Sequence, residues 1–411
     1  MMAKKRYIVT YKDPDTDIKS ATKVMARAIS TKASAMRDGV AAFASPEAFE
    51  TFDEDVLVFE GIGVSTTTLT GAQAKKLEND PEVVAIEEDF EVHAMAKVDT
   101  EARLTPQPHP QPPQNGGEVV ETREPYTEAE DFAEPQPTLE SFISPPQIVL
   151  PTPWNVLAVR ADKAWPRTTG RDVKVAIIDT GIDDDHLDLS VYGGASFVSG
   201  VASWNDDQGH GTHCAGIAGG RQSRGFIGVA PECELYAVKV LAGNGSGFLS
   251  WVLAGMAWAV SNNMEVASMS LGSDVGAPDA ACSVAFQTAA QQLINNGCIV
   301  IAAAGNAGHL SNHWVGQPAR CHGFMAVGSI DRQRHWSAFS SYGSDNGPLS
   351  NVEIAAPGSS INSTRRGGGH TVMSGTSMAC PHVAGAAALL KQLHPTWSPE
   401  RIRARLRDTA T

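Results

Sequence analysis

From about residue 152 onward, apolar segments of strand length alternate with longer helical segments. The strand-like segments read VKVAIID, ELYAVKVL, VASMSL, CIVIAAAG and FMAVGSI, and helices are expected near 211–219, 248–263, 279–296, 377–393 and 399–409. Strands that are apolar throughout and separated by helices are typical of a parallel sheet buried on both faces. The pattern therefore predicts an α/β fold, a doubly wound and mostly parallel sheet with helices on both faces.

The part of the chain before this sheet divides into two regions. Residues 6–95 contain strand patterns in RYIVTY, DVLVFEGIGVSTTTL and EVVAIEEDF and a helix over GAQAKKLEN, where Thr70 and Gln73 have capping-box spacing. Residues 96–150 are rich in Pro, Gln and Glu and hold too few apolar residues for a core. We expect a small α+β ferredoxin-like domain over 1–95, a linker over 96–150 and the α/β domain over 151–411. The alternative is that part of the linker docks on a neighbouring domain.

Composition limits the classes of partner. The net charge of -14 argues against nucleic acid or an anionic membrane, because both would repel the protein. No run approaches the about 18 apolar residues of a membrane span, and the basic start MMAKKRYIVTYKD is not followed by the apolar segment of an export signal. The six cysteines include no C-x-x-C pair, which argues against zinc and redox motifs. We expect most of them to be buried, and one or two disulfides stay possible.

Polar residues follow several of the predicted strands or begin predicted helices. VAIIDTGI ends a strand at Asp179, QGHGTHCAG places His210 at a helix start, IAAAGN ends a strand at Asn306, and GTSMA places Ser377 at another helix start. A carboxylate, an imidazole, an amide donor and a hydroxyl are the groups that nucleophilic acyl transfer requires. Each fragment alone has a plainer interpretation: Ser377 as a helix cap, His210 as a structural histidine and Asn306 as a turn residue.

The chain order Asp, His, Ser is that of subtilisin. The segments VAIIDTGID, GHGTHCAGIAG, GVAPECELYAVKVL, MSLG, AAAGN, SSYG, AAPG and GTSMACPHVAGAAALL resemble subtilisin-like serine peptidases, in order, over about residues 152–410. The resemblance includes features of the subtilisin and proteinase K branches. It implies Asp179, His210 and Ser377 as a catalytic triad, with Asn306 donating its amide to the oxyanion and no cofactor for catalysis. It assigns His213 to helix packing.

The resemblance also implies a groove that binds protein or peptide substrates by adding their backbone to strand-like edges. MSLG and GNGSGFL match the two edges, and IAAAGN and VGQP match the pocket for the P1 side chain. The implied groove and pocket residues are Ser270, Leu271, Gly272, Gly247, Ala303, Ala304, Gly305 and Gly316. Because no charge lines this pocket, we expect a large apolar or uncharged P1 residue rather than Lys or Arg.

The small N-terminal domain resembles the inhibitor-like propeptide of secreted subtilisins, especially in YIVTYK and VVAIEEDFEVHAM. Such a propeptide assists folding and then inhibits as a product-like segment. The match implies a monomeric zymogen that cuts itself between Met95 and Ala96, with Val92 in the S4 pocket. The long linker predicts a second cut near residues 145–152.

The sequence departs from the family pattern in several places. Asp188 in DHLDL matches a calcium carboxylate, yet GGRQSRGFIG is short and carries Arg221 and Arg224, which would repel a cation. Calcium at Asp188 therefore stays an open expectation. Cys214, next to the HGTH motif, implies mercury sensitivity. The chain stops at Thr411 without the usual YGxG segment, which suggests a truncated C-terminus. The propeptide type favours secretion, and cytoplasmic action is the alternative.

Two other function classes share parts of this pattern. A catalytically silent binding protein would keep the fold, but the four polar groups are all present. An aspartic protease would need a second DTG or DSG, or a short chain that dimerises. Fluorophosphonate labelling of Ser377 separates these classes, because only the serine peptidase should react.

Overall fold

The computed structural model describes residues 4–29, 40–42, 56–98, 152–221, 227–273, 282–308, 314–343 and 352–410. The expected linker lies outside the described residues from residue 99 onward. Of residues 145–152, where the second cut was expected, the structure describes only Thr152. Arg224 and Thr411 also lie outside the described residues.

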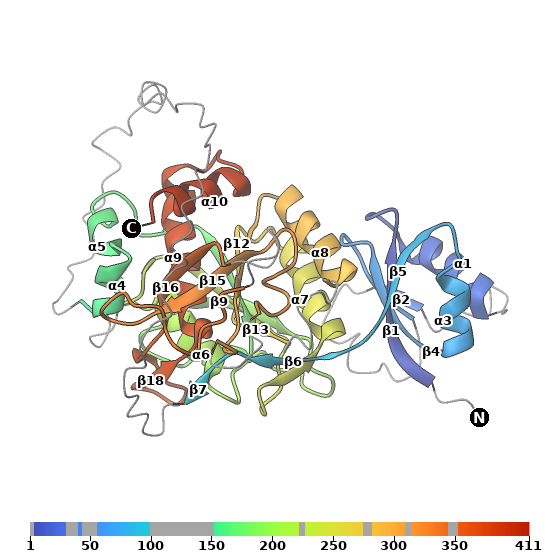
Figure 1. Cartoon of the computed structure of the whole chain (residues 1–411), viewed down its shortest axis with the longest axis horizontal. Coiled ribbons are helices and arrows are strands. Elements are labelled where there is room, and N and C mark those ends of the chain that lie inside the picture. Colours follow the sequence, from blue (N-terminus) through green and yellow to red (C-terminus); the bar gives the residue numbers. More distant parts are fainter. Residues whose placement is uncertain are drawn as a thin grey trace, which may run out of the picture. The chain divides into compact units, whose positions relative to one another are not determined.

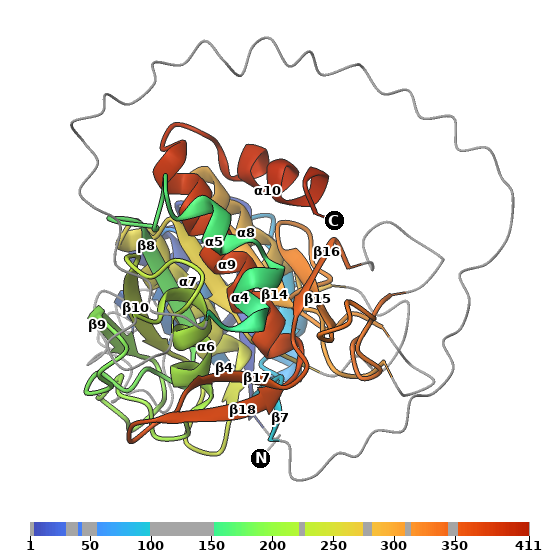
Figure 2. The same ribbon diagram turned by 90° about the vertical axis from the view of Figure 1, so that its left-hand side faces the viewer.

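A seven-stranded sheet forms the centre of the α/β domain, and each of its strands runs parallel to its neighbours. In spatial order its strands are β16 (Ile354–Pro357), β15 (Met325–Ile330), β14 (Ile299–Ala303), β12 (Val266–Met269), β8 (Lys174–Asp179), β10 (Glu234–Lys239) and β9 (Val191–Ser196). The predicted α/β sheet is confirmed (Figure 1, Figure 2).

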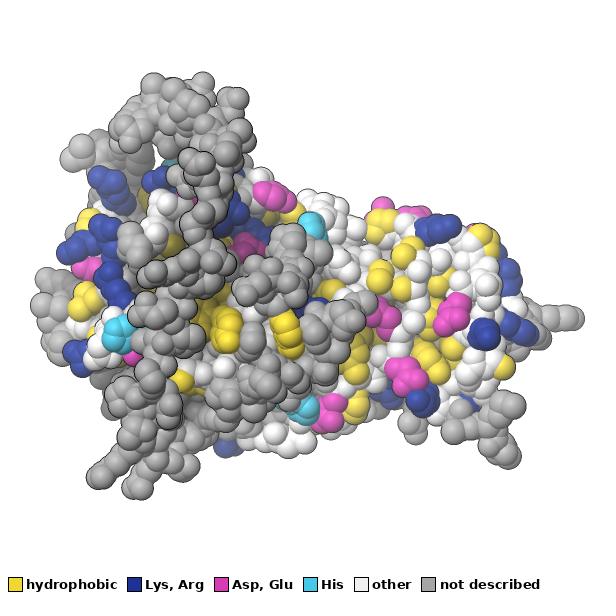
Figure 3. Space-filling model, in the orientation of Figure 1, with side chains coloured by type: hydrophobic (Ala, Val, Ile, Leu, Met, Phe, Trp, Pro, Cys, Tyr) yellow, Lys and Arg dark blue, Asp and Glu magenta, His cyan; other side chains and the backbone are white. Residues whose placement is uncertain are grey.

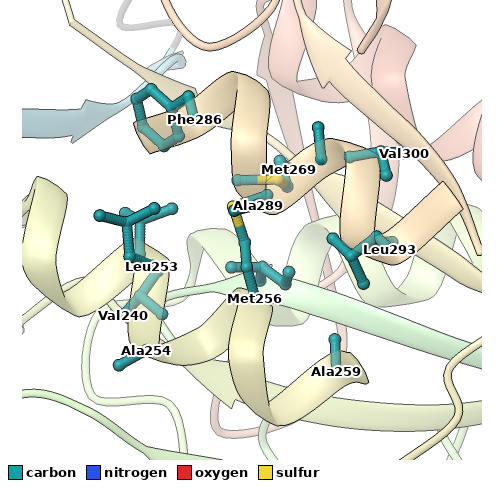
Figure 4. Close-up of a cluster of buried hydrophobic side chains, with 14 of the residues drawn as sticks. Val240, Leu253, Ala254, Met256, Ala259, Met269, Phe286, Ala289, Leu293 and Val300 are labelled. Atoms are coloured by element: carbon teal, nitrogen blue, oxygen red, sulfur yellow. The ribbon is translucent and has the colours of Figure 1, made fainter. Parts of the chain in front are cut away.

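Helices cover both faces of this sheet. They are α4 (Trp154–Ala158), α5 (Ala161–Ala164), α6 (His210–Gly219), α7 (Leu249–Ser261), α8 (Val284–Asn295), α9 (Thr376–Leu393) and α10 (Pro399–Asp408). Alternate residues of β8 enter different cores, as the period of a strand requires: Ala176 and Ile178 pack with α7 and α8, whereas Val175 and Ile177 pack with α6 and α9. Figure 4 shows part of the first core, where Met256 and Leu293 lie near Met269 and Val300.

Helix boundaries follow local capping groups. Ser398 caps α10 and Pro399 is its first residue, as predicted. Helix α8 begins at Val284, later than the expected start near 279, because the Ser283 hydroxyl accepts from the Phe286 N–H and fixes the first turn there. The predicted strand VASMSL divides into β12 and a separate short strand, β13 (Leu271–Gly272).

The N-terminal domain is a five-stranded sheet with helices. The sheet order is β2 (Val40–Ala42), β3 (Val56–Phe59), β4 (Val64–Thr70), β1 (Lys4–Tyr11) and β5 (Val83–Glu88), with helices α1 (Ile18–Ile29) and α3 (Gly71–Leu77). The capping box of Thr70 and Gln73 is present, whereas α1 was not predicted. One face of the sheet, including Leu57 and Phe59, shares its core with α7.

Two small sheets join the N-terminal domain to the α/β domain. Strand β6 (Glu91–Ala94) lies between β11 (Ser246–Phe248) and β13, and β7 (Lys97–Val98) extends the hairpin of β17 (Ile361–Thr364) and β18 (His370–Ser374). Residues 91–98 therefore run along the carboxyl edge of the large sheet.

The visible surface of the N-terminal domain carries acidic and basic side chains interspersed with apolar ones (Figure 3). None of the helices in the described ranges combines the length and hydropathy that a membrane span requires.

Candidate active site

Asp179 and His210 meet where the end of β8 faces the start of α6. Asp179 is the last residue of β8 and fully buried, and its Oδ1 accepts a hydrogen bond from the Nδ1 of His210 at 2.7 Å. The backbone N–H of Thr180 donates to the same oxygen at 2.7 Å. His210 is the first residue of α6 and follows Gly209, whose φ of 112° favours glycine. This pair leaves the Nε2 of the imidazole available on the opposite side of the ring.

The pKa of His210 is set by opposing effects. Burial lowers the pKa, but the charge and hydrogen bond of Asp179, together with the charge of Asp206, outweigh it, so the pKa lies above the ordinary 6.5. Asp206 is itself buried and accepts from the Thr180 hydroxyl at 2.9 Å and from the Thr212 N–H at 3.0 Å, which caps the first turn of α6.

His213, one turn along α6, has a different environment. Its Nε2 lies 3.1 Å from the carbonyl oxygens of Ile361 and Thr371. Burial, and then the charge of His210, lowers its pKa to about 3. His213 is thus a neutral, packed imidazole, which agrees with the helix-packing role expected for it.

Ser377 lies at the start of α9 and is fully buried. Its Oγ donates to the carbonyl oxygen of Ser270 at 3.1 Å. Among the described residues, the Nε2 of His210 has no hydrogen-bond partner. The Nε2 of His210 is therefore a buried acceptor without a donor, and the Ser377 hydroxyl is bonded to the Ser270 carbonyl instead of to this nitrogen.

The carbonyl oxygen of Met95 accepts two convergent hydrogen bonds. The Nδ2 of Asn306 donates at 2.8 Å and the backbone N–H of Ser377 at 3.3 Å. Asn306 is oriented in turn, because its Oδ1 accepts from the backbone N–H of Thr376 at 2.9 Å and from the Thr376 hydroxyl at 3.1 Å. Two donors aimed at one carbonyl oxygen are the geometry of an oxyanion hole.

The residues before Met95 bind as an added strand. In the antiparallel register of β6, Val92 pairs with Gly247 and Ala94 pairs with Leu271. The N–H of Met95 donates to the carbonyl of Ser270 at 3.1 Å. Val92 is fully buried. The structure thus brings the predicted groove and the predicted cleavage segment together.

The side chain of Met95 is 8% exposed and lies against Gly272, where an added Cβ would come within 2.8 Å of the Met95 Cε. The predicted pocket segments lie together: Gly316 donates its N–H to the carbonyl of Ala304 at 2.9 Å, and the N–H of Gly305 donates to Thr376 Oγ1 at 3.1 Å. Ala303 is buried in the adjoining core. Small residues here leave room for an apolar side chain.

Sequence reasoning missed the binding edge that follows Met95. Lys97 and Val98 pair with Ser374 and Met373 of β18. The available signal was the segment HTVMS directly before GTSMA, since a strand leading into the turn at Ser377 places its edge beside the candidate site. Strand pairing therefore holds the chain on both sides of the Met95–Ala96 bond.

Two carboxylates of the N-terminal domain cap helices of the α/β domain. Asp89 accepts from the N–H of Ser250 at 2.9 Å and from its hydroxyl at 2.7 Å, at the start of α7. Glu87 accepts from the N–H of Ala285 at 3.0 Å and from the Ser283 hydroxyl at 3.2 Å, at the start of α8. Carboxylates at helix N-termini pair with free N–H groups and with the positive end of the helix dipole.

Among the described residues, the surroundings of Asp188 do not form a calcium site. Its Oδ2 lies 3.0 Å from the Nε2 of His370, and its carbonyl oxygen accepts from the N–H of Arg221 at 2.6 Å. Within the described ranges, the clustered carboxylates able to share an ion are Asp183, Asp184 and Asp185, without Asp188. Calcium requires several oxygen ligands, whereas Asp188 faces an imidazole donor. The calcium expected at Asp188 is not supported by these contacts.

The cysteines divide into one disulfide and a buried set. Cys282 and Cys321 are bonded, and the free cysteines among the described residues, all buried, are Cys214, Cys233, Cys298 and Cys380. Burial raises the pKa of Cys214 well above its ordinary value, so this thiol stays protonated. Its sulfur nevertheless shares a cluster with Asp179 and His210. Mercury sensitivity stays a prediction.

Comparison with known proteins agrees with this geometry. A family model described as the subtilase family matches residues 170–411, and one described as peptidase inhibitor I9 matches residues 6–95. The chain is 48% identical over 246 residues to Subtilisin NAT of Bacillus subtilis subsp. natto, covering 59% of this chain and 61% of that relative.

The chain covers a larger share of the length of two other relatives. The chain is 47% identical over 261 residues to Subtilisin Savinase of Lederbergia lenta, covering 63% of this chain and 91% of that relative. It is 38% identical over 365 residues to a thermostable alkaline protease of Halalkalibacterium halodurans, covering 88% of this chain and 82% of that relative. The last match extends beyond the α/β domain. The chain belongs to the subtilase family, and its N-terminal domain is of the peptidase inhibitor I9 type.

Proposed function

We propose that this chain is a subtilisin-type serine endopeptidase, made as a zymogen that cleaves itself between Met95 and Ala96. The observation that carries the proposal is the Met95 carbonyl, which accepts from Asn306 and from the Ser377 N–H. In this proposal residues 1–95 are the propeptide, 96–150 the linker and 151–411 the catalytic domain. Its substrates are proteins or peptides, and the propeptide is its intramolecular partner.

The proposed reaction assigns one role to each polar group. Ser377 Oγ attacks the Met95 carbonyl carbon while its proton passes to the Nε2 of His210. Asp179 holds the Nδ1–H and stabilises the imidazolium. The tetrahedral oxygen receives hydrogen bonds from Asn306 Nδ2 and the Ser377 N–H. His210 then returns its proton to the Ala96 nitrogen, the peptide bond breaks, and water hydrolyses the acyl-enzyme with the same base. These side chains supply every group that the steps require.

The pocket supports a preference for large apolar or uncharged P1 residues. Met95 is nearly buried there, and Gly272 leaves space for its side chain. We also infer secretion, because the Cys282–Cys321 disulfide favours an oxidising compartment. A monomer is proposed as the working state.

The test of the proposed function is fluorophosphonate labelling combined with sequencing of the cleaved chain. We expect label on Ser377 and a new N-terminus at Ala96, because the nucleophile and the held carbonyl define both sites. Unlabelled protein that stays whole would support the silent-binding alternative.

The pH dependence of hydrolysis is expected to follow His210. The imidazole must be neutral to accept the proton, so activity rises with pH through the pKa of His210, with a midpoint above 6.5. Asp206→Asn removes one of the charges that raise this pKa and should move the midpoint of kcat/KM to lower pH. A midpoint unchanged in the variant would contradict the assigned cause.

Removal of a propeptide cap is expected to destabilise the uncut chain. Asp89→Ala removes both acceptors for Ser250 and should lower the free energy of unfolding by about 1–2 kcal/mol. The measurement is urea unfolding of the Ser377→Ala chain, which does not cleave itself. Glu88→Ala is the matched control, because Glu88 is exposed and pairs only at the surface with Lys5 at 2.8 Å. Equal losses in the two variants would contradict the capping role.

The pair of Asp188 and His370 should contribute stability without calcium. His370→Ala leaves a buried carboxylate without this donor and should lower the apparent melting temperature by about 2–6 °C. Measured by thermal unfolding of the Ser377→Ala chain, this loss is expected to be the same with calcium and with chelator. His335→Ala, which removes an imidazole 3.6 Å from Asp331 at the surface, is the control. A chelator effect that Asp188→Asn abolishes would instead show calcium at this residue.

A further inference from the structure

The disulfide between Cys282 and Cys321 joins two segments beside the pocket that holds Met95. Cys282 directly precedes Ser283, the N-cap of α8. Cys321 ends the turn Gly316–Cys321, within which the Arg320 N–H donates to the Gly316 carbonyl at 2.9 Å. The two cysteines are 39 residues apart in sequence, with their Cα atoms 5.4 Å apart.

The turn Gly316–Cys321 forms part of the pocket. The N–H of its first residue, Gly316, donates a hydrogen bond to the carbonyl of Ala304 at 2.9 Å. The carbonyl of Gln317 accepts from the N–H of Ser273, also at 2.9 Å. An added Cβ at Gly272 would lie 2.5 Å from the Gln317 carbonyl oxygen and 2.8 Å from the Met95 Cε. The Gln317 backbone and the Met95 side chain therefore both lie against Gly272. A shift of the turn changes the space available to the P1 side chain.

The start of α8 is the other anchor of this turn. The Oε1 of Gln317 accepts from the N–H of Ser283 at 2.7 Å. The Ser283 hydroxyl also lies 3.2 Å from Glu87 of the propeptide. While the propeptide is bound, Glu87 helps to hold the α8 start. After the propeptide leaves, the disulfide and the Gln317–Ser283 hydrogen bond still tie the turn to α8.

We propose that the Cys282–Cys321 disulfide positions the Gly316–Cys321 turn and thereby determines how well the pocket accepts a large apolar P1 side chain. This inference rests on the proposed peptidase function. A disulfide restricts the distance between its Cα atoms to about 4.4–6.8 Å, a restraint that single hydrogen bonds at a loop do not impose. A large P1 side chain is long enough to contact the turn, whereas an alanine side chain is too short to reach it.

The test compares two peptide substrates that differ only in Met or Ala at P1, using the self-processed wild-type enzyme and a Cys282→Ser/Cys321→Ser variant. We expect kcat/KM for the Met substrate to fall about 3–10-fold in the variant, mainly through KM, because a loosened pocket loses contacts with the side chain. For the Ala substrate we expect a change below about 2-fold. Cys233→Ala, which removes a buried free thiol elsewhere, should leave the Met-to-Ala ratio unchanged.

A reductant provides a second measurement that does not depend on folding of the variant. Dithiothreitol added to the folded wild-type enzyme should lower the Met-to-Ala ratio by the same factor and should leave the ratio of the double variant unchanged. Equal losses for both substrates would show a purely structural disulfide and overturn the inference, as would no loss for either. Wild-type enzyme that cleaves neither peptide and does not label at Ser377 would refute the proposed function, and the inference with it.

Discussion

A Ser377→Ala chain is expected to stay at 43.5 kDa, whereas the wild-type chain splits after Met95. The reason is that the Met95 carbonyl already lies in the hydrogen bonds of Asn306 and the Ser377 backbone, and only the attacking hydroxyl is removed. Loss of the nucleophile in subtilisin lowers kcat by about 10⁶-fold, and we carry that magnitude over from this relative. Intact-mass measurement over hours checks the result.

Ser261→Ala is the matched control for this experiment. Ser261 ends α7 and its hydroxyl donates to the Ala257 carbonyl at 3.1 Å, remote from Met95. This variant should split as the wild-type chain does. Cleavage of the Ser377→Ala chain after Met95 at the wild-type rate, at a dilution that excludes a contaminating protease, would refute Ser377 as the nucleophile.

The Asn306→Leu variant is expected to lose most of its turnover while binding substrate almost normally. Leu has a similar size but no N–H donor, so the oxyanion keeps only the Ser377 N–H. Removal of the matching amide in subtilisin costs about 10²–10³-fold in kcat, and that magnitude is carried over from this relative. Because the donor acts mainly on the developing charge, kcat should fall and KM should change little.

The measurement is steady-state hydrolysis of a peptide with Met at P1, with Asn262→Leu as the control. Asn262 lies at the C-cap of α7, where its Nδ2 donates to the Trp258 carbonyl at 2.8 Å. A rise in KM at constant kcat in Asn306→Leu would show that the amide binds the ground state and not the transition state.

Much of the fold was predictable because its signals are local. The β8 strand is apolar between its two ends, over residues 175–178, as a strand covered on both faces must be, and α10 begins where Ser398 and Pro399 place it. The start of α8 was placed too early, because the helix begins only at Val284, where the Ser283 hydroxyl caps it. The strands β9, β17 and β18 were not predicted, since none has the uniformly apolar run that was used to find strands, and the apolar run of β16 is only four residues long. Helix α1 was also not predicted, although its apolar residues recur at helical spacing.

The candidate site likewise has residues that the sequence predicted and contacts that it did not. Asp179, His210, Asn306 and Ser377 were found by their places after strands and at helix starts, and the structure brings Asp179 to His210 and Asn306 to the Met95 carbonyl. The caps supplied by Asp89 and Glu87 were not found. A cap is normally sought within a few residues of the helix, whereas Asp89 and Ser250 are 161 residues apart in the chain.

The sequence by itself therefore determined the five central strands of the sheet, most helix boundaries and the residue types of the site, because strand period, capping and motif chemistry act over a few residues. Only the tertiary structure decided which distant groups meet: β6 between β11 and β13, His370 against Asp188, and Cys282 with Cys321 among six cysteines. These contacts depend on how whole elements pack, and packing is set by the summed burial of many side chains rather than by any short segment.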